Sequence, residues 1–252
     1  MRKILVSAFF IFSFLMVFAG DINADFQKAN KLYTEKKYNE ALKLYKKIEE
    51  KLKKGNKHSF KLNYNLGCVY YRLNEIAPSR YYFEKAKKIK PFDKDLLKNI
   101  SLIKKSLKDG EKEIQKGVFL KFYEKLYLSF SLNTLTFLSI FFFLILFLFV
   151  AMFVSSRFDK KKMYYGMGIT LFLFLLTSVM FYSRYKFTFA PKAIIFEKEA
   201  DVFSEPNTSS TVLFKLHEGT KVSVEEELNG YSHISLPDGL NGWIDSRNIK
   251  EF

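Results

Sequence analysis

The chain has 252 residues, of which 41 are Lys or Arg and 26 are Asp or Glu, so its formal net charge is +15. This length leaves room for a membrane segment and two small soluble domains. The single cysteine excludes an intramolecular disulfide. Residues 21–110 carry 23 basic and 11 acidic side chains, but the lysines are spread along predicted helix faces, which favours a solvated surface over a nucleic-acid site.

The first nineteen residues have the pattern of a secretory signal peptide. Two basic residues precede an apolar run at residues 4–18, which is short for a membrane-spanning helix. We therefore expect residues 1–19 to be a signal peptide that is cut after Ala19, with Ala24 as the alternative cleavage site. If the segment is instead kept as a signal anchor, the domain that follows is still exported.

Residues 22–112 are predicted to form an all-α domain of two helix–turn–helix repeats and a capping helix. The segments 38–48 and 76–86 align with an offset of 38 residues, close to the length of a two-helix repeat. Residues 93–107 carry apolar side chains at helical spacing, which suits a helix that caps the repeats.

The second of these units resembles the tetratricopeptide repeat family. The resemblance rests on residues at the positions that the family uses for helix packing: Leu66, Gly67, Tyr70, Phe83, Ala86 and Pro91. Ser79 departs from the pattern, because the family usually has Ala there. The resemblance implies a solenoid with a concave groove that binds peptides or protein segments.

Carried over position by position, the resemblance also implies which side chains line the protein-binding groove. The candidates are Phe26, Asn30, Tyr33, Lys37, Tyr64, Cys68, Tyr71 and Arg72. The alternative is that the aromatic residues among them pack against a neighbouring helix. Because the domain is basic, the expected ligand is an acidic segment or one that ends in a carboxylate.

Two long uncharged runs predict a transmembrane α-helical hairpin. Residues 126–156 and 163–183 contain no Lys, Arg, Asp or Glu, and a helix needs roughly 20 apolar residues to cross a bilayer. We expect the spanning helices at residues 132–155 and 163–185, joined by a short basic turn. A hairpin returns the chain to the side that it left, so the domains before and after it would share a compartment.

The stretch before the first span, residues 113–131, has aromatic side chains at intervals of three or four, with lysines among them. This mixture beside a spanning helix is typical of an interfacial helix along the lipid headgroups. The alternative is that it extends the first spanning helix. Signal peptide and hairpin together predict a bacterial inner (cytoplasmic) membrane protein with both soluble domains in the periplasm.

Residues 191–252 change to short alternating runs separated by turn residues, which predict a small all-β barrel of six antiparallel strands. The segment resembles bacterial SH3-like domains through the sequences NGY at 229–231 and DGLNGWI at 238–244. Tyr231 stands where the family often has Trp. The resemblance implies a binding surface that includes Tyr231 and Trp243.

The sequence carries no recognised catalytic motif. It has no glycine-rich phosphate loop, no H-E-x-x-H, no nucleophile elbow and no cysteine pair. His58, His217 and His233 have no paired metal ligands in the sequence around them, and Cys68 is expected to be a packed thiol. We therefore expect a protein that is not an enzyme, without a metal or a cofactor.

In their order along the chain, these segments resemble the repeat-containing E-type members of the Bat (aerotolerance) family. The resemblance implies a role in envelope integrity or stress tolerance, beside von Willebrand factor A-type membrane proteins and a MoxR-type ATPase. We predict an adaptor, anchored in the lipid bilayer, that assembles protein partners through its groove and its SH3-like domain. The alternative is an envelope anchor whose SH3-like domain binds peptidoglycan.

Overall fold

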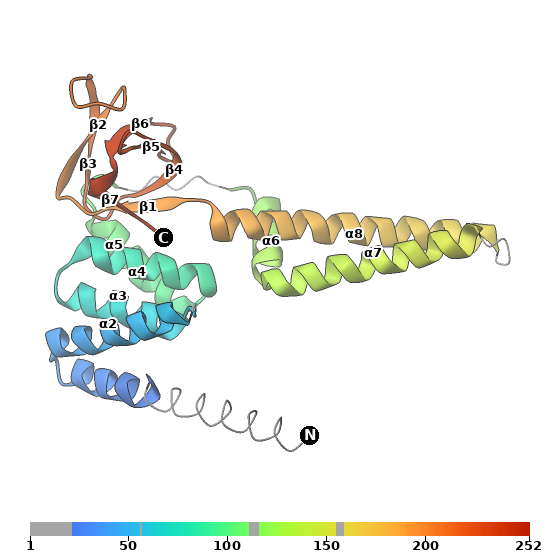
Figure 1. Ribbon diagram of the computed structural model, residues 1–252, viewed down its shortest axis with the longest axis horizontal. Helices are drawn as coiled ribbons and strands as arrows, with labels where there is room; N and C mark the ends of the chain where they lie inside the picture. Colours follow the sequence, from blue (N-terminus) through green and yellow to red (C-terminus); the bar gives the residue numbers. More distant parts are fainter. Residues whose placement is uncertain (1–21, 56, 111–115, 155–158) are drawn as a thin grey trace, which may run out of the picture. The chain divides into compact units, whose positions relative to one another are not determined.

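The computed structural model describes four stretches of the chain: residues 22–55, 57–110, 116–154 and 159–252. Their helices and strands are shown in Figure 1. The chain forms two compact units, of which the first combines residues 1–112 with 191–252 and the second is formed by residues 113–190. The predicted signal peptide at residues 1–19 lies outside the described residues.

The helical part of the first unit contains five helices within the described residues. They are a first helix at 22–34, then α2 (Tyr38–Lys54), α3 (Phe60–Arg72), α4 (Ile76–Ile89) and α5 (Lys94–Ser106). Two of these helices begin at a side chain that caps them. Ser59 Oγ accepts a hydrogen bond from the Leu62 N–H, and Asp93 Oδ1 accepts one from the Leu96 N–H, which satisfies a backbone donor at each helix start.

The turn between paired helices has the same backbone conformation in both pairs. Lys36 and Asn74, which are 38 residues apart, have φ angles of 62° and 61°, in the left-handed region. The Lys36 N–H donates to the Tyr33 carbonyl at 3.0 Å, and the Asn74 N–H donates to the Tyr71 carbonyl at 3.1 Å. Two equivalent turns are therefore 38 residues apart, which is the same offset that aligns the segments 38–48 and 76–86.

Small residues let the paired helices approach closely. A Cβ atom on Gly67 of α3 would lie 2.5 Å from the Phe83 ring of α4. The residues 38 positions earlier are Ala29 and Tyr45, and both are buried. Ser79 Oγ donates a hydrogen bond to the Gly67 carbonyl at 2.8 Å, so this buried hydroxyl is satisfied although the family pattern has Ala at its position.

The rest of the first unit is one antiparallel sheet of seven strands in the order β3-β2-β6-β5-β4-β1-β7. The strands are β1 (Lys192–Ile195), β2 (Glu199–Phe203), β3 (Val212–His217), β4 (Lys221–Leu228), β5 (Tyr231–Ser235), β6 (Asn241–Asp245) and β7 (Ile249–Glu251), with the 3-10 helix η1 (Ser246–Asn248) before β7. The prediction of six strands is wrong by one. β7 has three residues, too few for an alternating pattern, and it is a strand because it pairs with β1.

The strand β1 contributes to two hydrophobic cores. Ala193 and Ile195 pack in the core of the barrel, whereas Ile194 packs among the helices in a cluster with Tyr81 and Tyr82. Alternate side chains of a strand point to opposite faces, so β1 is covered by the barrel on one face and by the helices on the other. The helical part and the barrel, which the sequence analysis treats as separate domains, belong to one compact unit.

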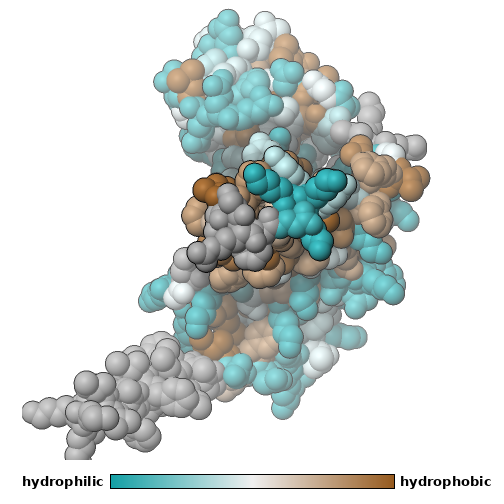
Figure 2. Space-filling view, turned by 90° about the vertical axis from the view of Figure 1, so that its right-hand side faces the viewer, coloured by the Kyte–Doolittle hydropathy of each residue, from teal (hydrophilic) through white to brown (hydrophobic). Residues whose placement is uncertain are grey.

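The second unit has three helices within the described residues: α6 (Val118–Leu128), α7 (Leu132–Val154) and α8 (Lys160–Phe189). Both α7 and α8 are long and apolar enough to span a membrane, with mean hydropathies of 3.1 and 1.7 in their most apolar windows. Their large apolar side chains are exposed, as a lipid-facing surface requires. Figure 2 looks along the hairpin from its tip, where brown side chains surround teal ones.

A short break at residues 129–131 separates α6 from α7, so the stretch before the first span is a helix of its own. Val118 and Phe119 at its start are 86% and 79% exposed. The Tyr123 hydroxyl hydrogen-bonds to Ser183 Oγ of α8 at 2.9 Å. An exposed apolar face on a helix tied to the end of a span is suited to the membrane interface.

Candidate functional site

A pocket of about 380 Å³ opens on the side of the helical part that is formed by the first helix and α3. It is lined by Asn30, Tyr33, Thr34, Tyr45, Tyr64, Asn65 and Cys68. Four of the candidate groove residues, Asn30, Tyr33, Tyr64 and Cys68, therefore lie around one cavity. We call this cavity the groove pocket.

Three side chains from three helices are hydrogen-bonded in the groove pocket. Asn30 Oδ1 accepts hydrogen bonds from the Tyr45 hydroxyl at 2.6 Å and from Asn65 Nδ2 at 2.9 Å. Within the described residues, Asn30 Nδ2 and Asn65 Oδ1 make no hydrogen bond to the protein. One amide donor and one amide acceptor are thus available to a ligand, and together they match the donor and acceptor of a peptide backbone.

Tyr45, Tyr64 and Cys68 of the groove pocket are neutral at physiological pH. Burial raises the pKa of Tyr45 and that of Tyr64 to about 12. Burial also raises the pKa of the Cys68 thiol to about 11, which keeps it protonated and weakly nucleophilic. The Tyr64 hydroxyl accepts a hydrogen bond from Asn99 Nδ2 of α5 at 3.1 Å. The pocket therefore offers polar, uncharged groups and aromatic walls.

A second pocket, of about 450 Å³, shares Asn30 and Asn65 with the groove pocket. Phe26 lines it, and the edge of the Phe26 ring meets the Tyr45 ring at a centroid distance of 5.7 Å. Lys61 also lines this pocket and is exposed. The pair Asn30 and Asn65 therefore lines both cavities.

The remaining three candidates lie beyond the pockets. Arg72 Nε donates a hydrogen bond to the Tyr33 hydroxyl at 3.4 Å, one helical turn past Cys68. Tyr71 is 41% exposed and lines neither pocket. Lys37 occupies the N-cap position of α2 without a capping side-chain hydrogen bond, and it pairs with Glu35 at 3.0 Å.

Sequence reasoning missed Asn65, Thr34 and the contribution of Tyr45. Asn65 could have been found from its surroundings, because it is a polar residue between Tyr64 and the buried Leu66. A polar group there needs a partner. The alignment of family positions gave Tyr45 a packing role, and its hydroxyl reaches Asn30 only once α2 has packed on the first helix.

The outer face of the barrel carries a row of rings. Phe203 of β2 and His233 of β5 are the cross-strand neighbours of Trp243 on β6. The His233 and Trp243 rings lie 5.0 Å apart, and the Tyr231 ring meets the edge of the Phe203 ring at 6.3 Å. The predicted residues Tyr231 and Trp243 thus share one half-exposed face. Flat rings of this kind stack on sugars or on apolar and cationic side chains.

The row of rings has an acidic and polar margin. Glu225 Oε2 lies 3.2 Å from His233 Nδ1. Beyond Tyr231, a pocket of about 400 Å³ is bordered by Asp245 and Arg247, which form an ion pair. A hydrogen bond from Arg247 lowers the pKa of Asp245. This surface therefore combines aromatic area with fixed carboxylates.

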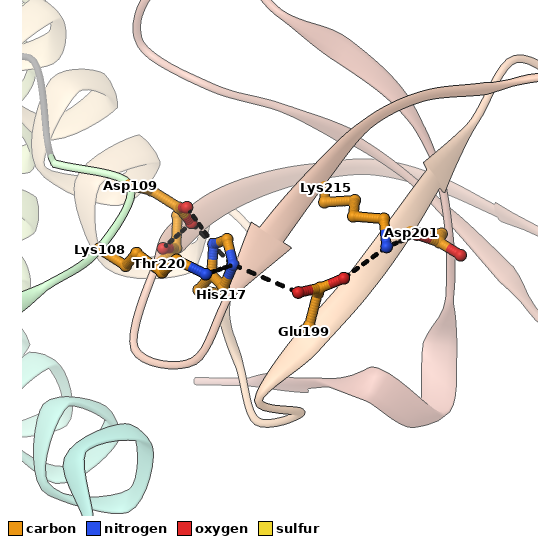
Figure 3. Close-up of polar contacts among 7 residues, drawn as sticks. All are labelled: Lys108, Asp109, Glu199, Asp201, Lys215, His217 and Thr220. Carbon is orange, nitrogen blue, oxygen red and sulfur yellow. Dashed lines mark hydrogen bonds and ion pairs between the residues drawn. The ribbon is translucent and has the colours of Figure 1, made fainter.

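A third polar cluster joins the end of the helical part to the β3–β4 turn of the barrel (Figure 3). Asp109 Oδ2 accepts hydrogen bonds from Thr220 Oγ1 at 2.6 Å and from the His217 backbone N–H at 2.7 Å, while Oδ1 contacts His217 Nδ1. Burial alone would raise the pKa of Asp109, but hydrogen bonds from Thr220 and His217 outweigh burial and lower it.

The same cluster extends along the sheet edge. His217 Nε2 lies 2.8 Å from Lys108 Nζ and 3.6 Å from Glu199 Oε2, and Glu199 in turn pairs with Lys215 (Figure 3). The Asp109 carboxylate is fully engaged in holding the turn. His217, for which the sequence offered no partner, therefore joins the two parts of the first unit. Its partner Asp109 lies 108 residues away in sequence, so no local pattern could reveal the pair.

Comparison with known families identifies the barrel. Residues 198–250 match the family model of the bacterial SH3 domain. The C-terminal barrel is thus a bacterial SH3 domain, as the sequence resemblance predicted. A comparison with curated proteins finds no match to the chain. A bacterial SH3 domain together with two helices that could span a membrane suggests a location in the cell envelope.

Proposed function

We propose that the chain is a membrane-anchored envelope protein that holds an extended segment of a protein partner in its helical groove. The observation that supports this most directly is that the pair Asn30 and Asn65 lines two pockets. An extended peptide cannot satisfy its own backbone groups, so a groove that holds one must supply donors and acceptors. The free amide atoms of this pair supply one of each.

The proposed activity is binding, not catalysis. Tyr45, Tyr64 and Cys68 are neutral at physiological pH, so they offer shape and hydrogen bonds without an activated nucleophile. Residues 21–110 have 23 basic against 11 acidic side chains, so an acidic segment would be attracted to the groove over several ångströms. We propose an acidic or carboxylate-ended peptide as the ligand.

The proposed location is the inner membrane of a bacterium, with both soluble parts in the periplasm. The signal-peptide pattern supports the export of the helical part. The first unit combines residues from both sides of the hairpin, which supports the idea that the segments before α7 and after α8 share a compartment.

A finer proposal is that the helices form a tetratricopeptide repeat domain and that the chain works in a Bat-type complex. The equivalent turns at Lys36 and Asn74 support the repeat, and the order of segments along the chain supports the family. The partners would be von Willebrand factor A-type membrane proteins and a MoxR-type ATPase. Their recovery with the tagged chain from crosslinked membranes tests this proposal.

The groove itself is tested by photocrosslinking in cells. A photoreactive phenylalanine analogue replaces Tyr33 in the groove pocket or, as a matched control, the exposed Tyr71, which lies outside both pockets. We expect defined adducts from position 33 and at least five-fold fewer from position 71. The variant Asn65→Leu should remove the adducts, because an apolar side chain leaves peptide backbone groups unpaired.

Two results would contradict the groove proposal. One is equal adduct formation from positions 33 and 71. The other is adduct formation that Asn65→Leu leaves unchanged while the variant unfolds at the same temperature as the wild type.

A second candidate function is anchoring to peptidoglycan through the barrel. Domains of the matching family commonly bind peptidoglycan or proteins, and the row formed by Phe203, Trp243, Tyr231 and His233 offers flat rings for stacking on sugars. The detergent-solubilised chain should then pellet with purified peptidoglycan, and Trp243→Ala should reduce pelleting about ten-fold. The control variant is Tyr71→Ala. If Tyr71→Ala reduces pelleting as much as Trp243→Ala does, the loss is non-specific and the row of rings is not the binding surface.

A further inference from the structure

The row of rings on the outer face of the barrel continues at both ends across the sheet. Val212 of β3 is the cross-strand neighbour of Phe203, and Glu226 of β4 is the cross-strand neighbour of His233. The complete line therefore crosses five neighbouring strands in the order Val212, Phe203, Trp243, His233 and Glu226. We call it the outer line.

The outer line changes in chemical character from one end to the other. Val212 at the first end is apolar and 43% exposed. The three rings in the middle are half-buried. At the far end Glu226 is exposed, and beside it Glu225 Oε2 lies 3.2 Å from His233 Nδ1. A ligand along the line would therefore meet an apolar group, then rings, then two carboxylates.

The carboxylates at the far end suit a cation from outside the chain. A hydrogen bond from Ser235 lowers the pKa of Glu225, so this side chain is charged at neutral pH. Its ionic partner is His233, which carries a full charge only when it is protonated. Within the described residues, Glu226 makes no ion pair. Two negative charges thus lie next to the rings.

Two cations of the barrel are held by other carboxylates. Lys215 pairs with Glu199, and Arg247 pairs with Asp245. In the part of the chain that the structure describes, no Lys or Arg side chain lies over the Trp243 ring. Among aromatic side chains, the face of a Trp ring attracts ammonium and guanidinium groups most strongly. The middle of the outer line therefore favours a cationic ligand, as its far end does.

The charge of the whole domain favours the same kind of ligand. Residues 198–250 contain nine acidic and five basic side chains, a balance of −4. A surface of this sign attracts a basic segment and repels an acidic one. Its preference is opposite to that of the helical groove, which lies in a basic part of the chain.

We propose that the outer line binds an extended basic segment of a partner protein. An aliphatic side chain of this segment packs on Val212, and a Lys or Arg lies between the Trp243 ring and the carboxylates of Glu225 and Glu226. Neighbouring strands are about 4.8 Å apart, so the line is about 19 Å long, which about six extended residues span. The proposal is independent of the groove, and it assigns to the row of rings a ligand other than the uncharged sugars considered above.

The single tryptophan of the chain, Trp243, lies at the centre of the outer line, so its fluorescence reports binding directly. The full chain in phosphatidylcholine nanodiscs, which carry no net charge, is titrated with a short capped peptide that has one leucine and two lysines separated by glycines. In the control peptide both lysine side chains are acetylated. We expect a saturable change with the lysine peptide below about 1 mM and at least about five-fold weaker binding of the control peptide.

Two double variants with equal net charge make the result specific. Glu225→Gln with Glu226→Gln should weaken binding of the lysine peptide at least about five-fold, and it should unfold at the wild-type temperature because both residues are exposed. The control, Glu197→Gln with Glu251→Gln, removes two exposed carboxylates outside the outer line and should bind the peptide as the wild type does.

The proposal is overturned if the two peptides bind equally, or if the lysine peptide causes no saturable change in that range. It is also overturned if the Glu225 and Glu226 variant binds as tightly as the wild type, or if the charge-matched control loses as much affinity, because binding would then follow net charge alone. These outcomes do not affect the groove, which is tested at position 33. Pelleting with peptidoglycan that persists after such a result would leave the row of rings as a sugar-binding surface.

Discussion

Among single residues, Glu84 is a buried charge that joins the helical part to the barrel. Its side chain is 5% exposed and contacts both Arg80 of its own helix and Lys221 of the barrel. Burial alone would raise the pKa of Glu84, but the charges of Lys221 and Arg80 outweigh burial and hold the pKa well below its ordinary value. Glu84 is therefore charged at every physiological pH.

Replacing Glu84 by Gln should destabilise the protein by about 3 kcal/mol, because it removes the buried carboxylate that pairs with Arg80 and with Lys221. Urea unfolding followed by Trp243 fluorescence measures the change in the free energy of unfolding. The matched control Glu50→Gln alters an exposed residue and should change the free energy of unfolding by less than about 0.5 kcal/mol. A loss for Glu84→Gln no larger than that of the control would show that the ion pairs contribute nothing.

Sequence reasoning at this scale could place candidate residues near one another where they follow a helical spacing. Asn30, Tyr33 and Tyr64 were selected from repeat positions, and all three line the groove pocket. It failed where function depends on long-range packing. Glu84 and Lys221 are 137 residues apart, and no periodicity links a helix residue to a strand residue across an intervening hairpin.

Among the elements, the β3–β4 turn is shaped by the helical part. Gly219 in this turn has a φ angle of 83°, which favours glycine, and a Cβ there would lie 2.7 Å from the Leu107 side chain. Asp109 follows Leu107 closely and holds the turn through Thr220 and His217. The end of the helical part and the turn therefore depend on each other for their conformation.

The contribution of Asp109 to stability should depend on pH. Its folded pKa is lowered from 3.8, so its stabilising effect is complete above that value and is lost as the pH falls through the folded pKa. We expect the difference in unfolding free energy between the wild type and Asp109→Asn to be largest at pH 5 and to shrink towards pH 2. A difference that stays constant over this range would show that the carboxylate charge is not involved.

Most elements could be predicted from local patterns, because helical stripes, uncharged runs and turn residues act over a few neighbours. The Asn229-Gly230 turn between β4 and β5, with φ angles of 52° and 79°, is one such case. The strand β7 could not be predicted in this way, because its three residues form a strand only by pairing with β1. The contact between the helices and the barrel is equally non-local.

On the scale of the whole molecule, the first unit is assembled from chain segments on both sides of the second. Ile194, Phe196 and Phe252 of the later segment pack in the same cluster as Tyr81 of the earlier one. Tyr81 makes edge contacts with the rings of Phe196 and Phe252. These apolar contacts predict that the helices and the barrel unfold together.

This prediction is tested by replacing residues 113–190 with a flexible Gly-Ser linker of about 20 residues. The shortened chain should be soluble and should show one cooperative thermal transition by both circular dichroism of the helices and Trp243 fluorescence of the barrel. The variant Ile194→Asp places a charge in the shared core. In this variant, the circular dichroism of the helices and the Trp243 fluorescence of the barrel should change at different temperatures. Two distinct transitions in the shortened chain without that change would refute the idea of a single folding unit.

The double role of β1 has a consequence for biogenesis. The ribosome makes the helices of the first unit before Ile194 and Phe196, so their apolar cluster stays incomplete while the helices α7 and α8 are synthesised. During that interval Tyr81 and its neighbours are exposed to holdases and proteases. If the hairpin spans a membrane as proposed, completion of the helical part would follow insertion of the hairpin, and a chain that stalls there would present an open hydrophobic face to quality control.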